Sequence, residues 1–448
     1  MNNINCSKPI LIRKGAIRAL SQILKNRRHI SETISIISKL YNITGTDRAL
    51  LTNIVNGVIK NLSFLDYGLS KLLSAGRFPS TDATNALRVG AYQIYATRIP
   101  DYASVDTTVE ALRSLNASPG EISLVNAVLR KFIRKWKYIK LPDDDLNYLS
   151  IKYSHPQWLV SRWLERYGKN ITEKMLSANN ESPPRTYRIN ILRIAPQDCK
   201  SNMRKQGIDF SETVFTEYFE LNDKIPVEEF SLFRDGMVSV QDAAFGIPIR
   251  ALEPSQSAMI LEIGSAPGGK TTDIIEKLDG EVKNLFAVDI SYSRIRFILE
   301  NVERLGHPVP NIIVADGKSA PFEAGTFDSI FIDAPCSSLG IIRRHPEIRW
   351  HKKPDDILTM AKMQTELIHS AVNLLKSNGT LVFTTCTTEP EENQNAVQTI
   401  TKSGMKIIPI PDVPSQFLES NGTMAITYPY RDNMDGSFTV RAKKLGSC

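Results

Sequence analysis

The chain has 448 residues, of which 42% are hydrophobic and 23% charged, and its net charge is +7. This length allows two or three domains, and the composition is that of a globular protein whose basic surplus suits a polyanionic partner. No apolar run approaches the roughly 18 residues of a membrane span. The five cysteines are scattered and form no C-x-x-C pair, which disfavours a disulfide framework and favours a reducing cytoplasm.

Residues 1 to 140 are predicted to form an all-helical domain. Apolar residues recur at helical spacing and no convincing strand interrupts them. The predicted helices are Ile10–Leu24, Thr46–Ile59, Leu62–Leu73, Thr81–Arg98, Val105–Leu115 and Pro119–Trp136. The first thirty residues are basic and lack acids, as in an organelle transit peptide, but they are not rich in serine. Their helical spacing favours a folded helix over a targeting signal.

The end of this segment, Leu129–Lys137, interleaves basic and aromatic residues. It fits a solvated helix face with cations near the carboxyl end of the helix. Taken alone, the segment fits this solvated face better than a surface that contacts RNA, and the RNA interpretation gains weight only beside the glycine turn and the cysteines of residues 241–448.

Residues 141 to 240 are predicted to form a small α/β unit. A proline and three acids in Leu141–Asp145 indicate a linker, and an amphipathic helix follows as far as Tyr167. Alternating polar and apolar residues predict a strand over 185–190. A helix near 196–206 and strands near 213–221 and 236–241 complete the unit.

Residues 241 to 448 open with a helix over Ala243–Leu252 and an apolar strand over Met259–Ile263. The strand stops at Gly264, a turn rich in glycine and proline follows, and Thr271–Leu278 has the pattern of an amphipathic helix. Such a turn presents free backbone N–H groups and the positive end of a helix dipole. It therefore suits an anion or a carboxylate.

Two nucleotide-binding interpretations fit this turn. Gly264–Thr271 satisfies the P-loop pattern G-x-x-x-x-G-K-[ST], and Asp333 after an apolar strand would supply its Mg²⁺-coordinating acid. The alternative is a Rossmann-like fold that binds a nucleoside cofactor. The strict dinucleotide pattern G-x-G-x-x-G is absent, because Ala266 takes its middle position. The turn alone does not decide between the two.

The strands that follow the turn end in acids. Leu285–Asp289 ends in a carboxylate suited to a ribose diol, and Asn311–Asp316 and Phe327–Asp333 repeat the pattern. One such acid is commonly a turn or cap residue. Three at one sheet edge favour a neutral or cationic nucleoside over a triphosphate. Strands near 380–385, 406–410 and 437–442 complete the predicted sheet.

With these features the chain resembles S-adenosylmethionine-dependent methyltransferases, in particular the RNA cytosine-5 methyltransferases of the RsmB/NOP/NSUN type. The resemblance rests on Ala266–Thr271, Asp333–Ser337, Thr385–Asn393 and Ile342–Trp350, the last typical of the RsmB/Sun-type small-subunit rRNA enzymes of that family. It implies a multi-domain fold with an all-α NusB-like N-terminal domain (1–140), a small α/β RNA-contacting subdomain (141–240) and a C-terminal Rossmann-like class I methyltransferase α/β sheet (241–448).

The resemblance also implies an activity and its partners. The enzyme would transfer a methyl group from S-adenosylmethionine to carbon 5 of a specific cytosine in 16S rRNA, through a covalent cysteine–cytosine intermediate. The rRNA would be naked or part of an early small-subunit particle, and the enzyme a cytoplasmic monomer without metal. Ser123–Arg130 resembles the end of the NusB-like RNA-binding domain. Arg188 and Asn190 fall where the family has an RNA-contacting strand, although ordinary exposed polarity explains them almost as well.

Roles for individual residues follow from the same resemblance. Cys386 would be the nucleophile, Cys336 would act in product release, and Asp333 would hold the target base with Lys270 beside it. Asp289 would bind the ribose hydroxyls and Asp316 the adenine edge. The expected cofactor-binding residues are Gly264, Ser265, Ala266, Pro267, Gly268, Gly269, Lys270, Asp289, Arg294, Asp316, Gly317, Asp333 and Pro335.

The chain departs from the family pattern at three places. The family usually has Cys-Ala where this chain has Gly264-Ser265, Gly at Ser338 and Ser at Thr387. All of these residues are small, so the departures bear on affinity more than on the type of reaction.

The chemistry of the residues supports a two-cysteine site. Cys336 follows the fourth predicted strand of the sheet and Cys386 ends the fifth. These strands are neighbours in a doubly wound sheet, so their ends lie about 5 Å apart. A single strand cysteine is most often a small buried hydrophobe, whereas two at adjacent strand ends are not easily explained by packing. A thiolate that adds to carbon 6 would activate carbon 5, which is a poor nucleophile by itself.

Three other functions fit parts of the sequence. The first is a P-loop NTPase. The second is a DNA cytosine methyltransferase, whose nucleophile lies in a Pro-Cys pair like Pro335-Cys336, although no large target-recognition insertion is present and Cys386 would have no role. The third is a non-catalytic RNA-binding protein, which the intact cysteine pair disfavours.

Overall fold

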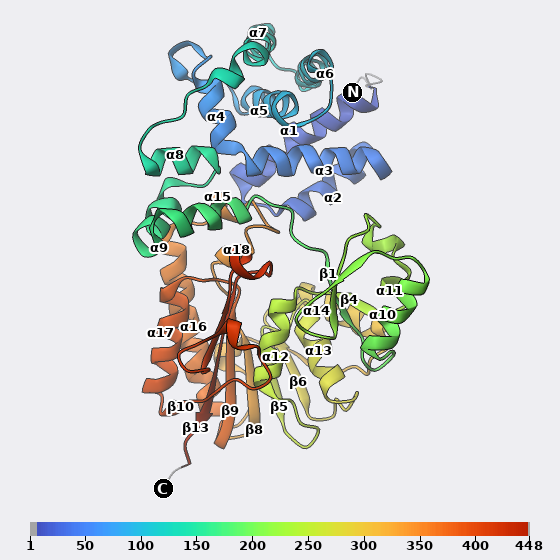
Figure 1. Ribbon diagram of the computed structural model, residues 1–448, viewed down its shortest axis with the longest axis vertical. Helices are drawn as coiled ribbons and strands as arrows, with labels where there is room; N and C mark the ends of the chain where they lie inside the picture. Colours follow the sequence, from blue (N-terminus) through green and yellow to red (C-terminus); the bar gives the residue numbers. More distant parts are fainter. Residues whose placement is uncertain (1–6, 447–448) are drawn as a thin grey trace. The chain divides into compact units, whose positions relative to one another are not determined.

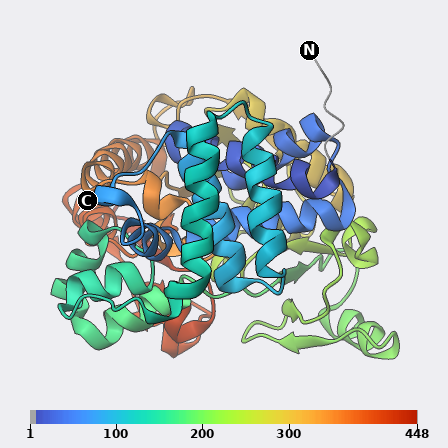
Figure 2. The same cartoon turned by 90° about the horizontal axis from the view of Figure 1, so that it is seen from above.

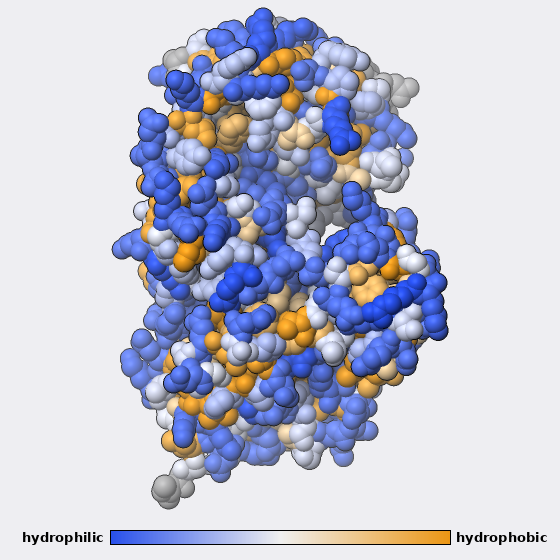
Figure 3. Space-filling view, viewed as in Figure 1, coloured by the Kyte–Doolittle hydropathy of each residue, from blue (hydrophilic) through white to orange (hydrophobic). Residues whose placement is uncertain are grey.

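The computed structural model describes residues 7–446, which divide into two compact units (Figure 1). The first unit contains residues 1–181 and 342–353, and the second contains 182–341 and 354–448. Hydrophilic residues cover most of the face shown in Figure 3. None of the helices in residues 7–446 combines the length and apolar character that a membrane crossing requires. The boundaries at residues 140 and 240 stay a prediction.

The first unit is helical. Its helices are α1 (Lys8–Asn26), α2 (Ile30–Tyr41), α3 (Gly45–Lys60), α4 (Leu62–Ser70), α5 (Thr81–Ala96), α6 (Asp101–Arg113), α7 (Pro119–Lys135), α8 (Asp145–Lys152), α9 (Gln157–Ala178) and α15 (Ile348–His351). Helices α6 and α7 lie side by side, as the view from above shows (Figure 2). The predicted helix start at Pro119 is confirmed, and Ser118 and Glu121 form a capping box there at the beginning of α7.

Two features of this unit were not predicted. Helix α2 is rich in β-branched residues, which have weak helix propensity, and it is held instead by burial of Ile30, Ile34 and Ile37 along one face. Helix α9 was expected to end at Tyr167. It kinks there, because Gly168 adopts a φ of 72°, and it then continues to Ala178.

The segment Ile342–Lys353 leaves the second unit between two of its elements and packs among the helices of the first. The guanidinium of Arg349 is fully buried and donates to the carbonyls of Ser154 and Asn179, each at 3.1 Å. The indole N–H of Trp350 donates to the carbonyl of Ile59 at 2.9 Å. The sequence motif in this segment thus completes the helical core, a role that its residues alone did not indicate.

The second unit carries two sheets. The small sheet has the antiparallel order β2-β3-β1-β4, formed by β1 (Thr186–Ile189), β2 (Phe210–Glu212), β3 (Tyr218–Leu221) and β4 (Val238–Val240). Helices α10 (Pro196–Lys205) and α11 (Ser231–Arg234) belong to the same part of the chain. Its core contains Cys199 and Met203 of α10 together with Tyr187 and Phe219 of the strands.

The large sheet has the order β11-β12-β13-β9-β8-β5-β6-β7, with β10 on β13. Its strands are β5 (Ile260–Ile263), β6 (Leu285–Asp289), β7 (Asn311–Val314), β8 (Phe327–Asp333), β9 (Leu375–Thr385), β10 (Met405–Ile407), β11 (Leu418–Glu419), β12 (Met424–Thr427) and β13 (Ser437–Lys444). Strands β5 to β9 pair in parallel and β13 runs antiparallel to β9. The predicted strands of this sheet are confirmed, and β11 and β12 are additions.

Helices cover both faces of this sheet (Figure 1). Helices α12 (Ile247–Leu252), α13 (Gly269–Lys277) and α14 (Tyr292–Leu305) share one core with the sheet. Helix α16 (Pro354–Leu374) and helix α17 (Pro390–Lys402) share the other, and the short α18 (Pro429–Asp432) follows β12. The parallel strands therefore direct their carboxyl ends to a single edge, where the predicted turn and acids meet.

Candidate active site

The glycine turn joins β5 to α13 at this edge. Gly264 has a φ of 83°, and a Cβ there would lie 2.4 Å from the carbonyl oxygen of Asp333. Gly268 has a φ of 99° and precedes the first residue of α13, and a Cβ there would lie 3.0 Å from Cα of Ile298. Only glycine fits both positions, because each combines a left-handed backbone with close contact to a neighbouring strand or helix. A Cβ on Gly269, by contrast, would meet nothing closer than 3.9 Å.

Asp289 and Arg294 hold the turn from two sides. The buried Asp289 carboxylate accepts the N–H of Ala266 at 3.0 Å and the N–H of Ser291 at 2.9 Å. Arg294, in the first turn of α14, donates to the carbonyl of Ala266. Both residues thus lie at the predicted turn, and the carboxylate is held in one orientation by the backbone.

The other two strand-end acids flank the turn. Asp316 follows β7, and its carboxylate accepts the N–H of Lys318 at 3.0 Å. Asp333 ends β8, and its carboxylate accepts a hydrogen bond from the amine of Lys270 at 2.6 Å. Burial alone lowers the pKa of Lys270, but the Asp333 carboxylate outweighs burial, and the pKa is raised. Lys270 therefore stays protonated where it donates to Asp333.

The two cysteines meet beside this ion pair. Strands β8 and β9 are parallel neighbours, and the sulfur atoms of Cys336 and Cys386 lie 2.9 Å apart. The hydrogen bond from Cys336 lowers the pKa of Cys386 despite its burial, and Ser338 lowers it further. The same contact, together with burial, raises the pKa of Cys336 well above its usual range. Cys386 is thus the member of the pair that ionises, while Cys336 keeps its proton.

Ser338 is a site residue to which the sequence assigned no role. Its hydroxyl lies 3.4 Å from the Cys386 sulfur and 3.8 Å from that of Cys336. Its φ of 62° lies in the left-handed region, which few side chains adopt readily and which favours glycine. The sequence could have indicated this role, because a serine hydroxyl stands at position 338, two residues after Cys336, where the expected pattern has glycine.

We expect Ser338→Gly to raise the pKa of Cys386, because the variant removes a donor to its thiolate. At a fixed neutral pH the thiolate fraction then falls, and alkylation of Cys386 by iodoacetamide slows several-fold. Peptide mapping of the alkylated protein across a pH series measures the effect. Ser403→Gly, at the half-buried residue that follows α17, serves as the control. An unchanged alkylation profile in Ser338→Gly would contradict the assignment.

A set of buried polar contacts fixes the two cysteine loops. Glu392 of α17 accepts the N–H of Ser337 at 2.8 Å, and burial raises the pKa of Glu392 to about 7. Gln364 of α16 donates to the carbonyl of Pro335 at 2.8 Å. The hydroxyls of Ser337 and Thr387 lie 2.9 Å apart, so Thr387 retains the hydroxyl contact that a serine could make. The sequence motif contained Glu392 and Thr387 but did not reveal these contacts.

Glu262 is a second acid that sequence reasoning missed. It lies in the middle of β5, fully buried, and burial raises its pKa to about 8. It is therefore mostly protonated at neutral pH. A lone acid within an otherwise apolar strand was the signal that could have singled it out.

The predicted RNA contacts at Arg188 and Asn190 are wrong, and so is the alternative of exposed strand polarity. Both side chains are 1% exposed. Arg188 forms ion pairs with Asp273 and Glu276 of α13 at 3.1 and 2.9 Å, and Asn190 donates to the carbonyl of Leu305 at 3.1 Å. Polar residues alternating along a strand predicted solvent on one face, but α13 and α14 cover that face.

Comparison with known proteins places this site in a family. The model described as 16S rRNA methyltransferase RsmB/F matches residues 249–443, that of the NusB family matches 11–134, and that of a ferredoxin-like domain of RsmF/B-like methyltransferases matches 155–228. These matches confirm the predicted order of a NusB-like helical part, a small α/β part and a methyltransferase sheet.

Individual proteins agree with the family models. The ribosomal RNA small subunit methyltransferase B of Klebsiella pneumoniae is 31% identical over 96% of each chain. The crystal structure of PH0851 has a TM-score of 0.81 at 24% identity, and the alignment covers 98% of each chain. The structure of NSun6 from Pyrococcus horikoshii with SFG has a TM-score of 0.59 at 21% identity and covers 65% of this chain and 99% of its own. The last two likenesses concern the fold.

Proposed function

Because this chain belongs to the 16S rRNA methyltransferase RsmB/F family, it is an S-adenosylmethionine-dependent methyltransferase of small-subunit rRNA, and we propose that it methylates carbon 5 of a cytosine through a covalent bond to Cys386. The observation that carries the proposal is the pair of sulfur atoms 2.9 Å apart, in which Cys386 has the lowered pKa. A thiolate is needed because carbon 5 reacts only after a nucleophile has added to carbon 6.

The residues of the turn fit a nucleoside cofactor better than a triphosphate. In a P-loop the lysine reaches the phosphates, whereas the amine of Lys270 is engaged by Asp333. Asp289 and Asp316 add negative charge on the same sheet edge, which would repel a triphosphate and suits ribose hydroxyls and an adenine amine. Bound there, S-adenosylmethionine supplies an electrophilic methyl group.

The chain's own residues perform the remaining steps. Cys386 forms a bond to carbon 6 of the cytosine, and the electron pair moves to carbon 5, which takes the methyl group. Asp333 binds the polar edge of the base, and Lys270 keeps that carboxylate oriented. Loss of the carbon 5 proton to a base then expels the Cys386 thiolate and restores the aromatic ring. Cys336, which carries a proton beside the departing sulfur, assists that release.

Tritium release tests the site of methylation. The substrate is 16S rRNA labelled with tritium at carbon 5 of cytosine, and methylation at carbon 5 must release the label into water. Bisulfite sequencing of small-subunit rRNA from cells with and without the gene then locates the nucleotide. Methyl incorporation without tritium release would contradict methylation at carbon 5.

We expect Asp289→Ala to lower the affinity for S-adenosylmethionine by about tenfold or more, because hydrogen bonds from a ribose diol to a carboxylate contribute about 1.5–3 kcal/mol each. Calorimetry measures the change. Asp289→Asn keeps one oxygen acceptor, so its affinity for S-adenosylmethionine is expected to lie between those of the wild type and Asp289→Ala. Glu281→Ala, an exposed acid before β6, is the control. Wild-type affinity in Asp289→Ala would remove the ribose role from this residue.

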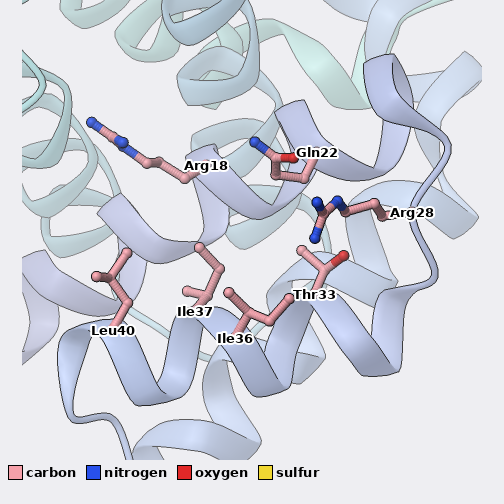
Figure 4. A pocket seen from close by; sticks show the side chains of 7 residues that line it. All are labelled: Arg18, Gln22, Arg28, Thr33, Ile36, Ile37 and Leu40. Carbon is pink, nitrogen blue, oxygen red and sulfur yellow. The ribbon is translucent and has the colours of Figure 1, made fainter. Parts of the chain in front are cut away.

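The helical unit supplies RNA affinity in this proposal. A groove of about 240 Å³ lies between α1 and α2 (Figure 4). Arg18 and Arg28 line it together with the apolar side chains of Ile36, Ile37 and Leu40. Guanidinium groups suit phosphates and an apolar floor suits the faces of unpaired bases, so the groove fits a single-stranded segment of rRNA.

A further inference from the structure

We propose that Cys336 and Cys386 form a reversible disulfide when a hydroperoxide oxidises the protein, and that this bond switches the methyltransferase off. The bond itself depends only on the geometry of the two thiols. The loss of activity depends on the proposed function of Cys386, and the experiment below separates the two.

The two cysteine side chains need to move very little to form a disulfide bond. The sulfur atoms are 2.9 Å apart, and a disulfide bond is about 2.05 Å long, so the side chains need to approach by less than about 1 Å. The N–H of Cys386 already contacts the Cys336 sulfur at 3.4 Å. The Cys336 loop is held by buried hydrogen bonds to Gln364 of α16 and Glu392 of α17. The Cys386 loop is held by Asn393 of α17, which donates to the carbonyl of Thr387 at 3.0 Å, so both thiols stay facing each other.

The two thiols have the different properties that the chemistry requires. Cys386 is partly exposed and is the member of the pair that ionises, so a hydroperoxide can reach a reactive sulfur. Cys336 is buried beside it and keeps its proton. The described cysteine outside the site, Cys199, is buried in the core of the small sheet, and burial raises its pKa to about 11. It should therefore stay reduced.

The reaction balances with hydrogen peroxide as the oxidant. The Cys386 thiolate attacks one peroxide oxygen, the O–O bond breaks, and hydroxide leaves while the sulfur becomes a sulfenic acid. The Cys336 sulfur then attacks the sulfenic sulfur, the S–O bond breaks, and the Cys336 proton leaves with the departing oxygen as water. Two electrons pass from the sulfur pair to the peroxide. A dithiol reductant reverses the bond by thiol exchange.

A disulfide would stop catalysis without disturbing the cofactor turn. The sulfur that must add to carbon 6 would be bonded to Cys336, so no adduct with RNA can form. Asp289 and the turn between Gly264 and Gly268 make no contact with either sulfur in the described hydrogen bonds, so cofactor affinity should remain.

The test uses the full-length protein treated with hydrogen peroxide, followed by alkylation of free thiols and non-reducing peptide mapping. We expect a cross-linked peptide pair containing Cys336 and Cys386, with Cys199 alkylated. We also expect methylation to fall by about tenfold or more, with recovery after dithiothreitol, and unchanged calorimetric affinity for S-adenosylmethionine. Cys199→Ser should behave like the wild type, and Cys336→Ser should instead carry sulfinic acid on Cys386.

Three results would overturn the proposal. One is oxidation of Cys386 to sulfinic acid in the wild type without a cross-link. Another is a bridge that uses Cys6 or Cys448, which lie outside the described residues. The third is a Cys336–Cys386 bridge that leaves methylation intact, which would also remove the nucleophile role from Cys386. If the reduced protein lacks cytosine-5 activity but the bridge still forms, the proposed function fails and the bridge stands.

Discussion

Cys386→Ala should abolish methylation and form no RNA–protein adduct, whereas Cys336→Ala should accumulate one. The first variant lacks the sulfur that adds to carbon 6, so neither methyl transfer nor a covalent intermediate is possible. The second retains that sulfur but lacks the neighbouring thiol 2.9 Å away, whose proton assists departure of the nucleophile. Attack and methyl transfer proceed, and the enzyme then stalls with RNA bonded to Cys386.

A denaturing gel with labelled 16S rRNA measures both outcomes. A slowly migrating band is expected for Cys336→Ala and is not expected for Cys386→Ala or the double variant. Cys199→Ala is the matched control, because this thiol is buried in the core of the small sheet and should leave turnover as it is. The reverse band pattern would place the nucleophile in Pro335-Cys336, as in DNA cytosine methyltransferases. Full activity in both variants would exclude covalent catalysis by either cysteine.

The sequence predicted the glycine turn and the strand ends beside it well because their signals are local. An apolar strand, a glycine turn and an amphipathic helix each occupy a few neighbouring residues, and the acids that end β6 and β8 follow directly from the strands. The adjacency of the strands before Cys336 and Cys386 also followed, since parallel strands of a doubly wound fold have few possible orders.

What the sequence did not reveal depends on contacts between distant residues. Helix α2 has weak propensity and is held by burial. The hydroxyl of Ser338 lies beside two sulfur atoms because its backbone adopts a left-handed conformation. Ile342–Lys353 lies between two elements of the second unit, yet its core partners come from residues 1–181. A fragment that begins at residue 141 would keep the carbonyls of Ser154 and Asn179 that accept from Arg349 but would lose the carbonyl of Ile59 that accepts from Trp350. Removal of the helical part therefore also disturbs Ile342–Lys353 and is a poor test of RNA binding.

The position of Arg188 also depends on contacts between residues distant in the sequence, and its substitution is expected to cause a large loss of stability. Its polarity within a strand suggested solvent or RNA, whereas it is buried against Asp273, Glu276 and Thr272 of α13. His307, after α14, lies 3.2 Å from the same Glu276 carboxylate. Burial alone lowers the pKa of Arg188, but the two carboxylates outweigh it and the net pKa is raised. One guanidinium thus pairs with two carboxylates on the helix that begins at the glycine turn.

Arg188→Met should lower the free energy of unfolding by about 3–5 kcal/mol, because it leaves two buried carboxylates without their compensating charge. Denaturant unfolding measures the loss. Arg234→Met, on an exposed arginine of α11, is the matched control and should change stability by less than about 0.5 kcal/mol.

A compensating variant distinguishes lost charge balance from lost packing. Arg188→Met combined with Asp273→Asn and Glu276→Gln removes the guanidinium and both carboxylates while keeping similar volumes, so it should recover much of the lost stability. If the triple variant is as unstable as Arg188→Met, packing of the arginine stem accounts for its role. If Arg188→Met itself unfolds like the wild type, the ion pairs contribute nothing to the stability of α13. In the expected case, affinity for S-adenosylmethionine should fall in Arg188→Met and return in the triple variant, because α13 begins directly after the glycine turn that we propose binds the cofactor.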